Sequence, residues 1–189
     1  MREIALHILD IARNSIEAGA TRLLITVIED ERADGLTIEI VDNGRGMAEE
    51  ELRHATDPFY TTRQTRRFGL GLSLLEATCQ RCGGEMHLRS IDGHGTHVTA
   101  SLQWSHLDRP PMGDMGASIS ALAAGAAQVQ LTYRHGVNGQ WLTIDTNALQ
   151  YELDDVGLRT PTVLQWLTRH VNAQLREMRA ATQEPGAAK

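Results

Sequence analysis

The first part of the chain shows a helical pattern followed by two strand-like segments. Apolar side chains recur every three or four positions over residues 3–18, which predicts an amphipathic helix with Ile4 and Ile8 on one side. Residues 23–29 and 36–41 are rich in Leu, Ile and Val and flank an Asp-Gly turn signal, so they predict a β-hairpin. This opening favours a helix packed on a sheet.

A long segment with weak periodicity follows the predicted hairpin. Residues 42–70 contain several glycines and predict a long loop, with a short helix near 49–55. Helical spacing returns over 71–81, and residues 85–90 and 96–104 predict a second pair of strands. Because long loops inside compact domains usually carry function, we expect the loop to contribute to a site.

A second unit is expected beyond a linker at 105–113, where two prolines interrupt any regular element. Residues 114–124 predict a helix. Residues 129–133 and 141–145 predict strands joined by an Asn-Gly turn, which is a strong hairpin signal. A final helix is expected after Thr160, with that threonine as its cap and a proline in its first turn.

We therefore expect an α+β fold in two parts, a two-layer α/β sandwich followed by a small α/β extension. The first domain comprises residues 1–104, the accessory domain comprises 114–182, and residues 183–189 form a disordered tail. The accessory domain shows no catalytic pattern, and Asp145 within it is interpreted as a cap or surface residue. We interpret this unit as an interaction or dimerisation domain.

The composition excludes several classes of protein. The chain of 189 residues is 41% hydrophobic and has a net charge of −6, which is typical of a globular protein and unlike the basic surplus of a nucleic-acid binder. No run approaches the ~18 consecutive apolar residues of a membrane-spanning helix. The N-terminal residues lack the basic and apolar regions of a secretory signal, so we expect a cytoplasmic location.

Cys79 and Cys82 form a C-x-x-C pair. Such a pair could serve as a redox centre or as half of a zinc site, with ligands such as His87, His94 or His97 completing the zinc site. We favour packing, because the two cysteines fall three positions apart on a predicted helix and buried cysteines usually behave as small apolar residues.

Polar side chains lie beside the apolar stripe of the first helix. Asp10, Asn14 and Glu17 are offset by four and seven positions and share one helical face. The amide oxygen of Asn14 is a suitable ligand for Mg²⁺. Asp10, one turn earlier, could act as a general base. Because many helices carry such polar edges, this pattern alone is a weak indication of a site.

Three glycine-containing segments add to this polar face. The run D-N-G-R-G-M at 42–47 directly follows a predicted strand. Its carboxylate can accept a hydrogen bond from the amino group of adenine, and its glycines let the backbone approach a base closely. The run F-G-L-G-L at 68–72 opens a helix, whose free N–H groups bind anions. The run G-H-G-T at 93–96 adds a threonine hydroxyl between two strands. Each run alone is also an ordinary turn.

Taken in order, these pieces resemble the GHKL superfamily, named after gyrase, the heat-shock chaperone, histidine kinases and the mismatch-repair protein MutL. They read L-H-I-L-D-I-A-R-N-S-I-E-A-G-A-T, V-D-N-G-R-G-M, D-P-F-Y-T-T-R, F-G-L-G-L-S-L and G-H-G-T. The first piece is most similar to mismatch-repair ATPases. The third and fourth pieces, D-P-F-Y-T-T-R and F-G-L-G-L-S-L, are most similar to the lid and second glycine pair of nitrogen-sensor histidine kinases. The resemblance covers about residues 3–104 and implies a Bergerat-type ATP-binding fold.

The resemblance implies a role for each matched position. Asn14 would bind Mg²⁺. Asp42 would accept a hydrogen bond from adenine, with Gly46 and Thr96 nearby. Residues 48–70 would form the ATP lid. The set implied to bind the nucleotide is Asn14, Asp42, Gly44, Gly46, Met47, Phe59, Thr61, Thr62, Gly69, Leu70, Gly71, Leu72 and Thr96.

The candidate catalytic residues are Asp10 and Arg63. Arg63 stands where the related lid has Lys, and either cation can reach a γ-phosphate. Position 10 is Asp where hydrolysing relatives carry Glu, which favours slow or absent hydrolysis. The chain begins at the nucleotide helix, without the phosphoacceptor hairpin of a complete histidine kinase. His7 is interpreted as a packing or helix-surface residue.

We weigh three functions that would use ATP and Mg²⁺. The chain could be a stand-alone kinase for a His or Ser/Thr of a partner protein, a slow ATPase that acts as a conformational switch or assembly factor, or an ATP sensor without turnover. The junction H-L-D-R-P-P-M-G-D-M resembles a bacterial group often associated with iron hydrogenase components, which implies a hydrogenase-related partner. We expect no nucleic acid as a partner and leave a homodimer open.

Overall fold

The computed structural model describes residues 3–57, 70–126, 128–153 and 156–183. Its strands are β1 (Arg22–Asp30), β2 (Gly35–Asp42), β3 (Met86–Ile91), β4 (Gly95–Gln103), β5 (Gln130–Val137) and β6 (Gln140–Asp145). Its helices are α1 (Ile4–Glu17), α2 (Glu49–Arg53), α3 (Leu70–Arg81), α4 (Met115–Gly125), α5 (Thr146–Leu153) and α6 (Pro161–Gln183). Within these described ranges, no helix combines the length and apolar character needed to cross a bilayer.

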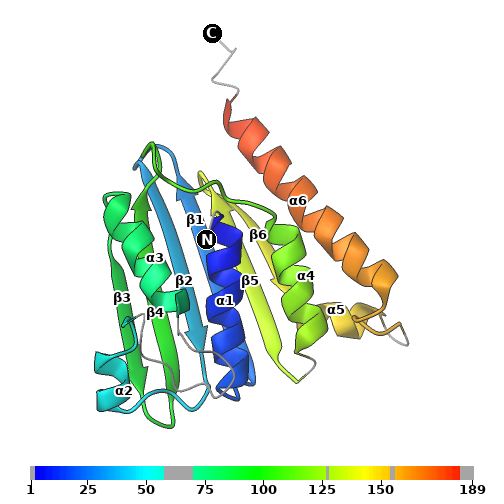
Figure 1. Ribbon diagram of the computed structural model, residues 1–189. Coiled ribbons are helices and arrows are strands. Elements are labelled where there is room, and N and C mark those ends of the chain that lie inside the picture. Colours follow the sequence, from blue (N-terminus) through cyan, green and yellow to red (C-terminus); the bar gives the residue numbers. More distant parts are fainter. Residues whose placement is uncertain (1–2, 58–69, 127, 154–155, 184–189) are drawn as a thin grey trace.

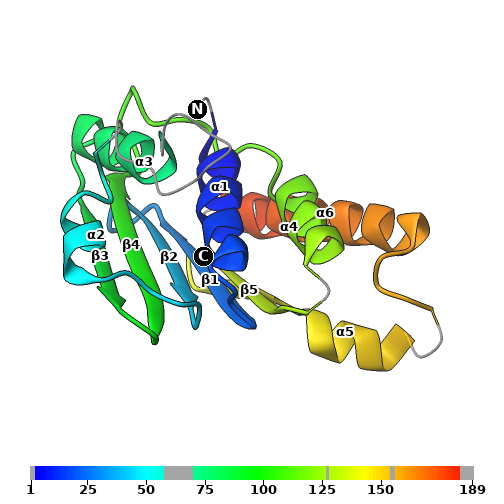
Figure 2. The ribbon, with the colours of Figure 1, turned by 60° about the horizontal axis from the view of Figure 1, so that its bottom comes forward.

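The six strands form one sheet in the order β3-β4-β2-β1-β5-β6, and helices cover one of its faces. Figures 1 and 2 show α1, α3, α4 and α6 on the same side of the strands. In β2, Leu36, Ile38 and Ile40 are buried and the residues between them are only half-buried, because successive strand residues point to opposite faces. The predicted two-layer α+β fold is confirmed.

Helix α1 lies near the middle of the helical layer (Figure 1). Ile4 and Ile8 are buried on its inner side, as the apolar spacing predicts. The side chain of its N-cap residue, Glu3, makes no capping hydrogen bond. Instead, the carbonyl oxygens of Pro111 and Met112 accept hydrogen bonds from the N–H groups of Ile4 at 3.0 Å and Ala5 at 2.9 Å. A helix start leaves such N–H groups free, so the expected linker stabilises α1 directly.

The C-terminal part of the chain continues the same sheet. β5 pairs in parallel with β1, with Leu23 opposite Leu131 and Ile25 opposite Tyr133, and β6 pairs antiparallel with β5. Helix α4 packs against α1, and its buried Met115 belongs to the same apolar cluster as the core of the first part. The division into an ATP-binding and an accessory domain stays a prediction, and the shared sheet and core link its two parts closely.

The N-termini of α5 and α6 show which features of a helix start could be predicted from the sequence. Thr160 takes the predicted cap position directly before Pro161, but its side chain does not contribute, because its hydroxyl is buried without a hydrogen-bond partner among the described residues. Thr160 contributes only its carbonyl, which accepts from the N–H of Leu164 at 3.0 Å. Helix α5, which the pattern did not predict, begins after Asp145. This carboxylate accepts from the N–H groups of Asn147 at 2.9 Å and Ala148 at 3.1 Å, which confirms its role as a cap.

A buried polar cluster joins β1, β5 and α6. The Glu29 carboxylate is fully buried and accepts hydrogen bonds from His135 Nε2 at 2.6 Å and Arg179 Nε at 3.0 Å. Burial lowers the pKa of His135, which keeps the ring neutral, so the Tyr133 hydroxyl donates to His135 Nδ1. Burial alone would raise the pKa of Glu29, but the hydrogen bonds from His135 and Arg179 outweigh it and hold that pKa below its usual range.

Candidate functional site

Asp42, the last residue of β2, is buried and held by three donors. Its Oδ1 accepts from the N–H of Gly44 at 2.8 Å and of Thr96 at 3.3 Å, and its Oδ2 accepts from the hydroxyl of Ser15 on α1 at 2.6 Å. Each carboxylate oxygen can accept about two hydrogen bonds. Oδ1 is therefore saturated by the backbone, whereas Oδ2 retains one open acceptor position for a donor outside this set.

The loop after Asp42 and the turn between β3 and β4 touch through their backbones. Gly46 has a φ of +67°, and a Cβ at this position would overlap the carbonyl of Ile91. Gly95 has a φ of +100°, and a Cβ there would overlap the carbonyl of Asp42. Both positions need the conformational freedom and the small size of glycine. The glycines found by sequence thus set the backbone around Asp42.

Thr96 lies beside Asp42 at the same end of the sheet. Val41 pairs with His97 across β2 and β4, and Ser90 pairs with Thr96 across β3 and β4. Asp42, Thr96 and Ser90 therefore form one row of polar side chains across the ends of these three strands. The hydroxyls of Ser90 and Thr96 are 2.9 Å apart. The row provides a carboxylate and two hydroxyls on the side of the sheet that the helices cover.

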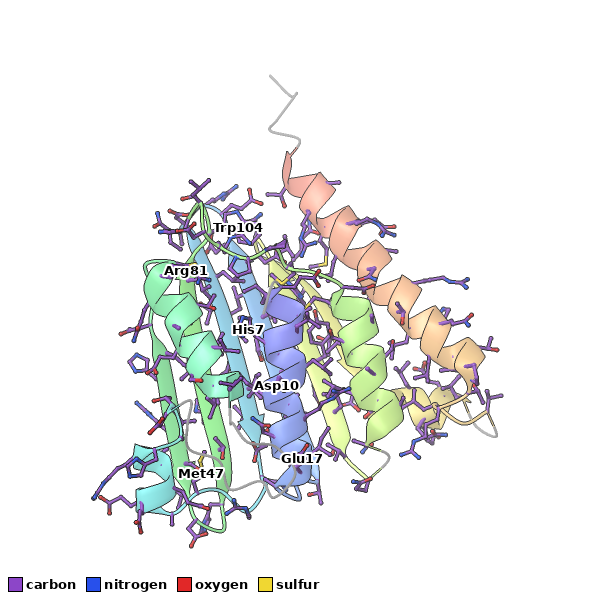
Figure 3. The ribbon with its side chains drawn as sticks, viewed as in Figure 1. His7, Asp10, Glu17, Met47, Arg81 and Trp104 are labelled. Atoms are coloured by element: carbon purple, nitrogen blue, oxygen red, sulfur yellow. The ribbon has the colours of Figure 1, made fainter. Side chains whose placement is uncertain are left out.

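Asp10 and Asn14 face the start of α3. A Cβ added to Gly71 would overlap the Asp10 carboxylate and lie 3.7 Å from Asn14 Nδ2. The polar face predicted on α1 is therefore in close contact with the first turn of α3. Figure 3 shows His7, Asp10 and Glu17 in order along α1, with Met47 near α2. Asp42, on β2, reaches the same helix through its hydrogen bond to Ser15.

The remaining predicted residues divide into two groups. Met47 is half-buried and its N–H donates to the Ser90 hydroxyl at 2.9 Å, whereas Leu70 is exposed and Leu72 is half-buried on α3. The other predicted positions lie outside the described residues, namely Phe59, Thr61, Thr62, Arg63 and Gly69.

The sequence reasoning missed two serines that organise this site. Ser15 lies among the buried apolar residues of α1, where a hydroxyl needs a buried partner. Its partner is Asp42, 27 positions later in the chain. Ser90 lies in a strand whose alternation gave no functional signal. Only the pairing of β3 with β4 brings it to Thr96.

The C-x-x-C pair lies in the core. Cys79 and Cys82 are both fully buried with free thiols, and burial raises the pKa of Cys79 to about 12. A buried thiol that holds its proton so firmly is a poor nucleophile and a poor metal ligand. No cluster of three or more His, Cys, Asp or Glu side chains suited to a metal occurs in the ranges that the structure describes. These observations favour the packing interpretation.

His7 is a buried residue of α1, one turn before Asp10. Neither of its ring nitrogens has a hydrogen-bond partner among the residues described. Burial lowers its pKa from 6.5 to about 4, with a smaller contribution from Arg81 that also lowers it and an opposing one from Asp10. The ring is therefore neutral and packed in the folded protein near neutral pH.

We expect His7 to make folding stability depend on pH. The unfolded chain binds a proton at this ring below about pH 6.5, whereas the folded protein resists protonation until about pH 4. Stability should therefore be complete above pH 6.5 and fall by about 3 kcal/mol as the pH drops to about 4. Urea denaturation of wild type and His7→Phe across this window measures it. An equally steep decline in His7→Phe would contradict the assignment.

Comparison with protein families decides the class of this site. Residues 2–106 match the family of histidine kinase-, DNA gyrase B- and HSP90-like ATPases, which is more than half of the 189 residues. The chain belongs to this ATPase family. The predicted GHKL superfamily is confirmed, and this GHKL domain is similar to the ATPase domains of histidine kinases. Family membership implies ATP binding.

Curated relatives of this GHKL chain include sensor kinases. It is 28% identical over 106 residues to the sensor histidine kinase ZraS of Escherichia coli O157:H7, which covers 56% of this chain and 23% of ZraS. It is 33% identical over 95 residues to sporulation kinase D of Bacillus subtilis (strain 168), which covers 50% of this chain and 19% of that kinase. The chain thus spans less than a quarter of either relative.

Solved structures show the same fold. The crystal structure of the N-terminal domain of a DNA repair protein superimposes with a TM-score of 0.54 at 17% sequence identity, covering 76% of this chain and 52% of that one. The superposition covers 76% of the chain, which is more than the part that matches the family at residues 2–106. Part of the segment after residue 106 therefore also has the fold of the DNA repair protein domain.

Proposed function

We propose that the chain binds ATP together with Mg²⁺ in the space bounded by Asp42, Thr96, Asn14 and the first turn of α3. The open acceptor position on buried Asp42 carries this proposal. A buried carboxylate that keeps an unused acceptor beside glycine backbone suits a planar base with an amino group, since that group donates the missing hydrogen bond. The 6-amino group of adenine is such a donor.

The phosphates would extend from the base toward the N-terminus of α3. Backbone N–H groups and the helix dipole favour anions there, and Gly69, Leu70, Gly71 and Leu72 would supply the amides. Asn14 would hold Mg²⁺ through its amide oxygen, since Mg²⁺ prefers oxygen ligands and usually keeps contacts with substrate phosphates. The bound ion would neutralise charge on the phosphates. The closeness of Gly71 to the Asp10–Asn14 face supports this arrangement.

Phosphoryl transfer to a partner protein is the reaction we favour. Such transfer depends mainly on positioning and on charge neutralisation around the γ-phosphate. Asp10, which adjoins the first turn of α3, would orient the acceptor and take its proton, and Arg63 would face the γ-phosphate. The similarity to a sensor histidine kinase and a sporulation kinase supports a kinase. Its acceptor would be a His or Ser/Thr of another protein, and the resemblance of the junction at residues 106–115 makes a hydrogenase-related protein one candidate.

A nucleotide-dependent switch is the second candidate, and the continuous sheet favours it. Strand β1 follows the helix that bears Asn14 and pairs along its length with β5 of the C-terminal part. Carbonyl oxygens of the segment before α4 also accept hydrogen bonds from the N–H groups at the start of α1. A shift of α1 on nucleotide binding would therefore reach β5 and α4, with slow hydrolysis as its timer.

We expect the wild-type protein to move label from ATP labelled at its γ-phosphate to a protein in an extract of its source cells, with MgCl₂ present. Asn14→Asp should abolish both this transfer and Mg²⁺-dependent ATP binding, because it sets a negative charge against the triphosphate. Asn147→Asp, the same change at an exposed position of α5, should behave as wild type.

The product distinguishes the candidate functions. Label that appears in a protein band supports the kinase. Label released only as inorganic phosphate supports the switch and contradicts the kinase. ATP binding without any release of label supports a passive sensor. Undiminished Mg²⁺-dependent affinity in Asn14→Asp would remove Asn14 from the site.

A further inference from the structure

Ser90, at the end of β3, makes three polar contacts around its hydroxyl. The N–H of Met47 donates to Ser90 Oγ at 2.9 Å, the carbonyl oxygen of Gly95 lies at 2.9 Å, and the hydroxyl of Thr96 lies at 2.9 Å. The side chain is half-buried between the loop that follows Asp42 and the start of β4. All three neighbours belong to segments that surround the candidate site for the base.

The direction of each hydrogen bond around Ser90 follows from its single proton. A hydroxyl donates once and accepts about twice. Because a carbonyl oxygen can only accept, Ser90 donates to Gly95. Because a backbone N–H can only donate, Ser90 accepts from Met47. The contact with Thr96 must then be one in which Thr96 donates and Ser90 accepts. The Thr96 proton is committed to Ser90 and is turned away from Asp42.

The donation of the Thr96 proton to Ser90 determines which hydrogen bonds the site can make with a base. With its proton on Ser90, Thr96 can only accept further hydrogen bonds. Asp42 Oδ2 likewise offers only an open acceptor position. The side chains at this end of the row thus present acceptors without a donor. An amino group on the base can donate to this pair, whereas a carbonyl oxygen at the same place would face lone pairs only.

We propose that Ser90 is a specificity-determining positioning residue that favours 6-amino purine nucleotides over 6-oxo purine nucleotides by fixing the Thr96 hydroxyl as an acceptor. The proposal rests on the proposed ATP site. Ser90 acts through Thr96 and does not touch the base. When the Ser90 hydroxyl is removed, the Thr96 hydroxyl becomes free to rotate and to donate to a 6-oxo group.

The test compares ATP with inosine triphosphate, in which a carbonyl replaces the 6-amino group. Calorimetry with MgCl₂ gives the ratio of the two dissociation constants for wild type, Ser90→Ala and Ser90→Thr. We expect the preference for ATP to fall about threefold to tenfold in Ser90→Ala, the effect of one hydrogen bond. It should return in Ser90→Thr, which keeps the hydroxyl. Both variants are checked for folding by circular dichroism.

A second background isolates the role of Thr96. In Thr96→Val no hydroxyl remains to be oriented, so adding Ser90→Ala should leave the nucleotide ratio unchanged. If Ser90→Ala weakens both nucleotides equally, its role is only structural and the proposal is overturned. If wild type binds neither nucleotide, the proposed ATP site itself fails. Should Ser90→Ala not fold, Ser90→Cys repeats the test with a weakly hydrogen-bonding group of similar size.

Discussion

Asp42→Asn is expected to reduce ATP affinity about 100-fold or more while leaving the fold intact. The backbone N–H groups of Gly44 and Thr96 require an acceptor at the Oδ1 position, so the amide oxygen must take that place. The amide nitrogen then occupies the Oδ2 position and points its hydrogens toward the adenine amino group. Two donors face each other, and the base loses its hydrogen bond without any change in the size of the side chain.

Calorimetry with ATP and MgCl₂ measures this loss, and thermal unfolding confirms that the variant is folded. Asp108→Asn is the matched control, because this carboxylate is exposed in the segment before α4. It should bind ATP as wild type does. Unchanged affinity in Asp42→Asn would show that the open acceptor position does not contact the base, and the proposed function would lose the observation that carries it.

Glu29→Gln is expected to cost about 3 kcal/mol of unfolding free energy. The neutral amide leaves Arg179, whose side chain is 31% exposed, without its buried counter-charge. When the amide oxygen takes the Oε1 position, the amide nitrogen takes the Oε2 position and faces Arg179 Nε, a donor whose hydrogen bond the carboxylate accepts at 3.0 Å. Because the folded pKa of Glu29 lies below its ordinary value of 4.5, the wild-type contribution is complete above that pH and declines as the pH falls through the folded pKa.

Urea unfolding gives this free energy, and Glu39→Gln is its control. Glu39 also contacts a histidine, His97 at 2.8 Å, but both side chains are 38% exposed on the open face of the sheet. Exposed pairs contribute at most about 1 kcal/mol, so this variant should change little. The double variant Glu29→Gln/Arg179→Met should recover part of the loss, since it removes the unpaired charge. A cost in Glu29→Gln no larger than in Glu39→Gln would show that the buried cluster adds no stability.

Local patterns determined most of the elements, although not α5, and the family of this protein. The apolar spacing over residues 3–18 corresponds to α1, because residues three or four positions apart in the sequence lie on the same face of a helix. The predicted Asn-Gly turn joins β5 to β6 with φ values of +48° at Asn138 and +91° at Gly139, which few other residues adopt. The ordered motifs around Asp42 and Gly71 indicated the ATPase family because each constrains backbone and side chain locally.

Tertiary structure alone decided which distant groups meet. The parallel pairing of β1 with β5 joins segments about 100 positions apart, and nothing in the alternation of either strand specifies its neighbour. Tertiary structure likewise brings Ser15 to Asp42, Ser90 to Thr96, and Glu29 to Arg179 of α6. A hydroxyl or carboxylate in a periodic stripe shows that a partner is needed. Only the packing of helices on the sheet shows which residue supplies it.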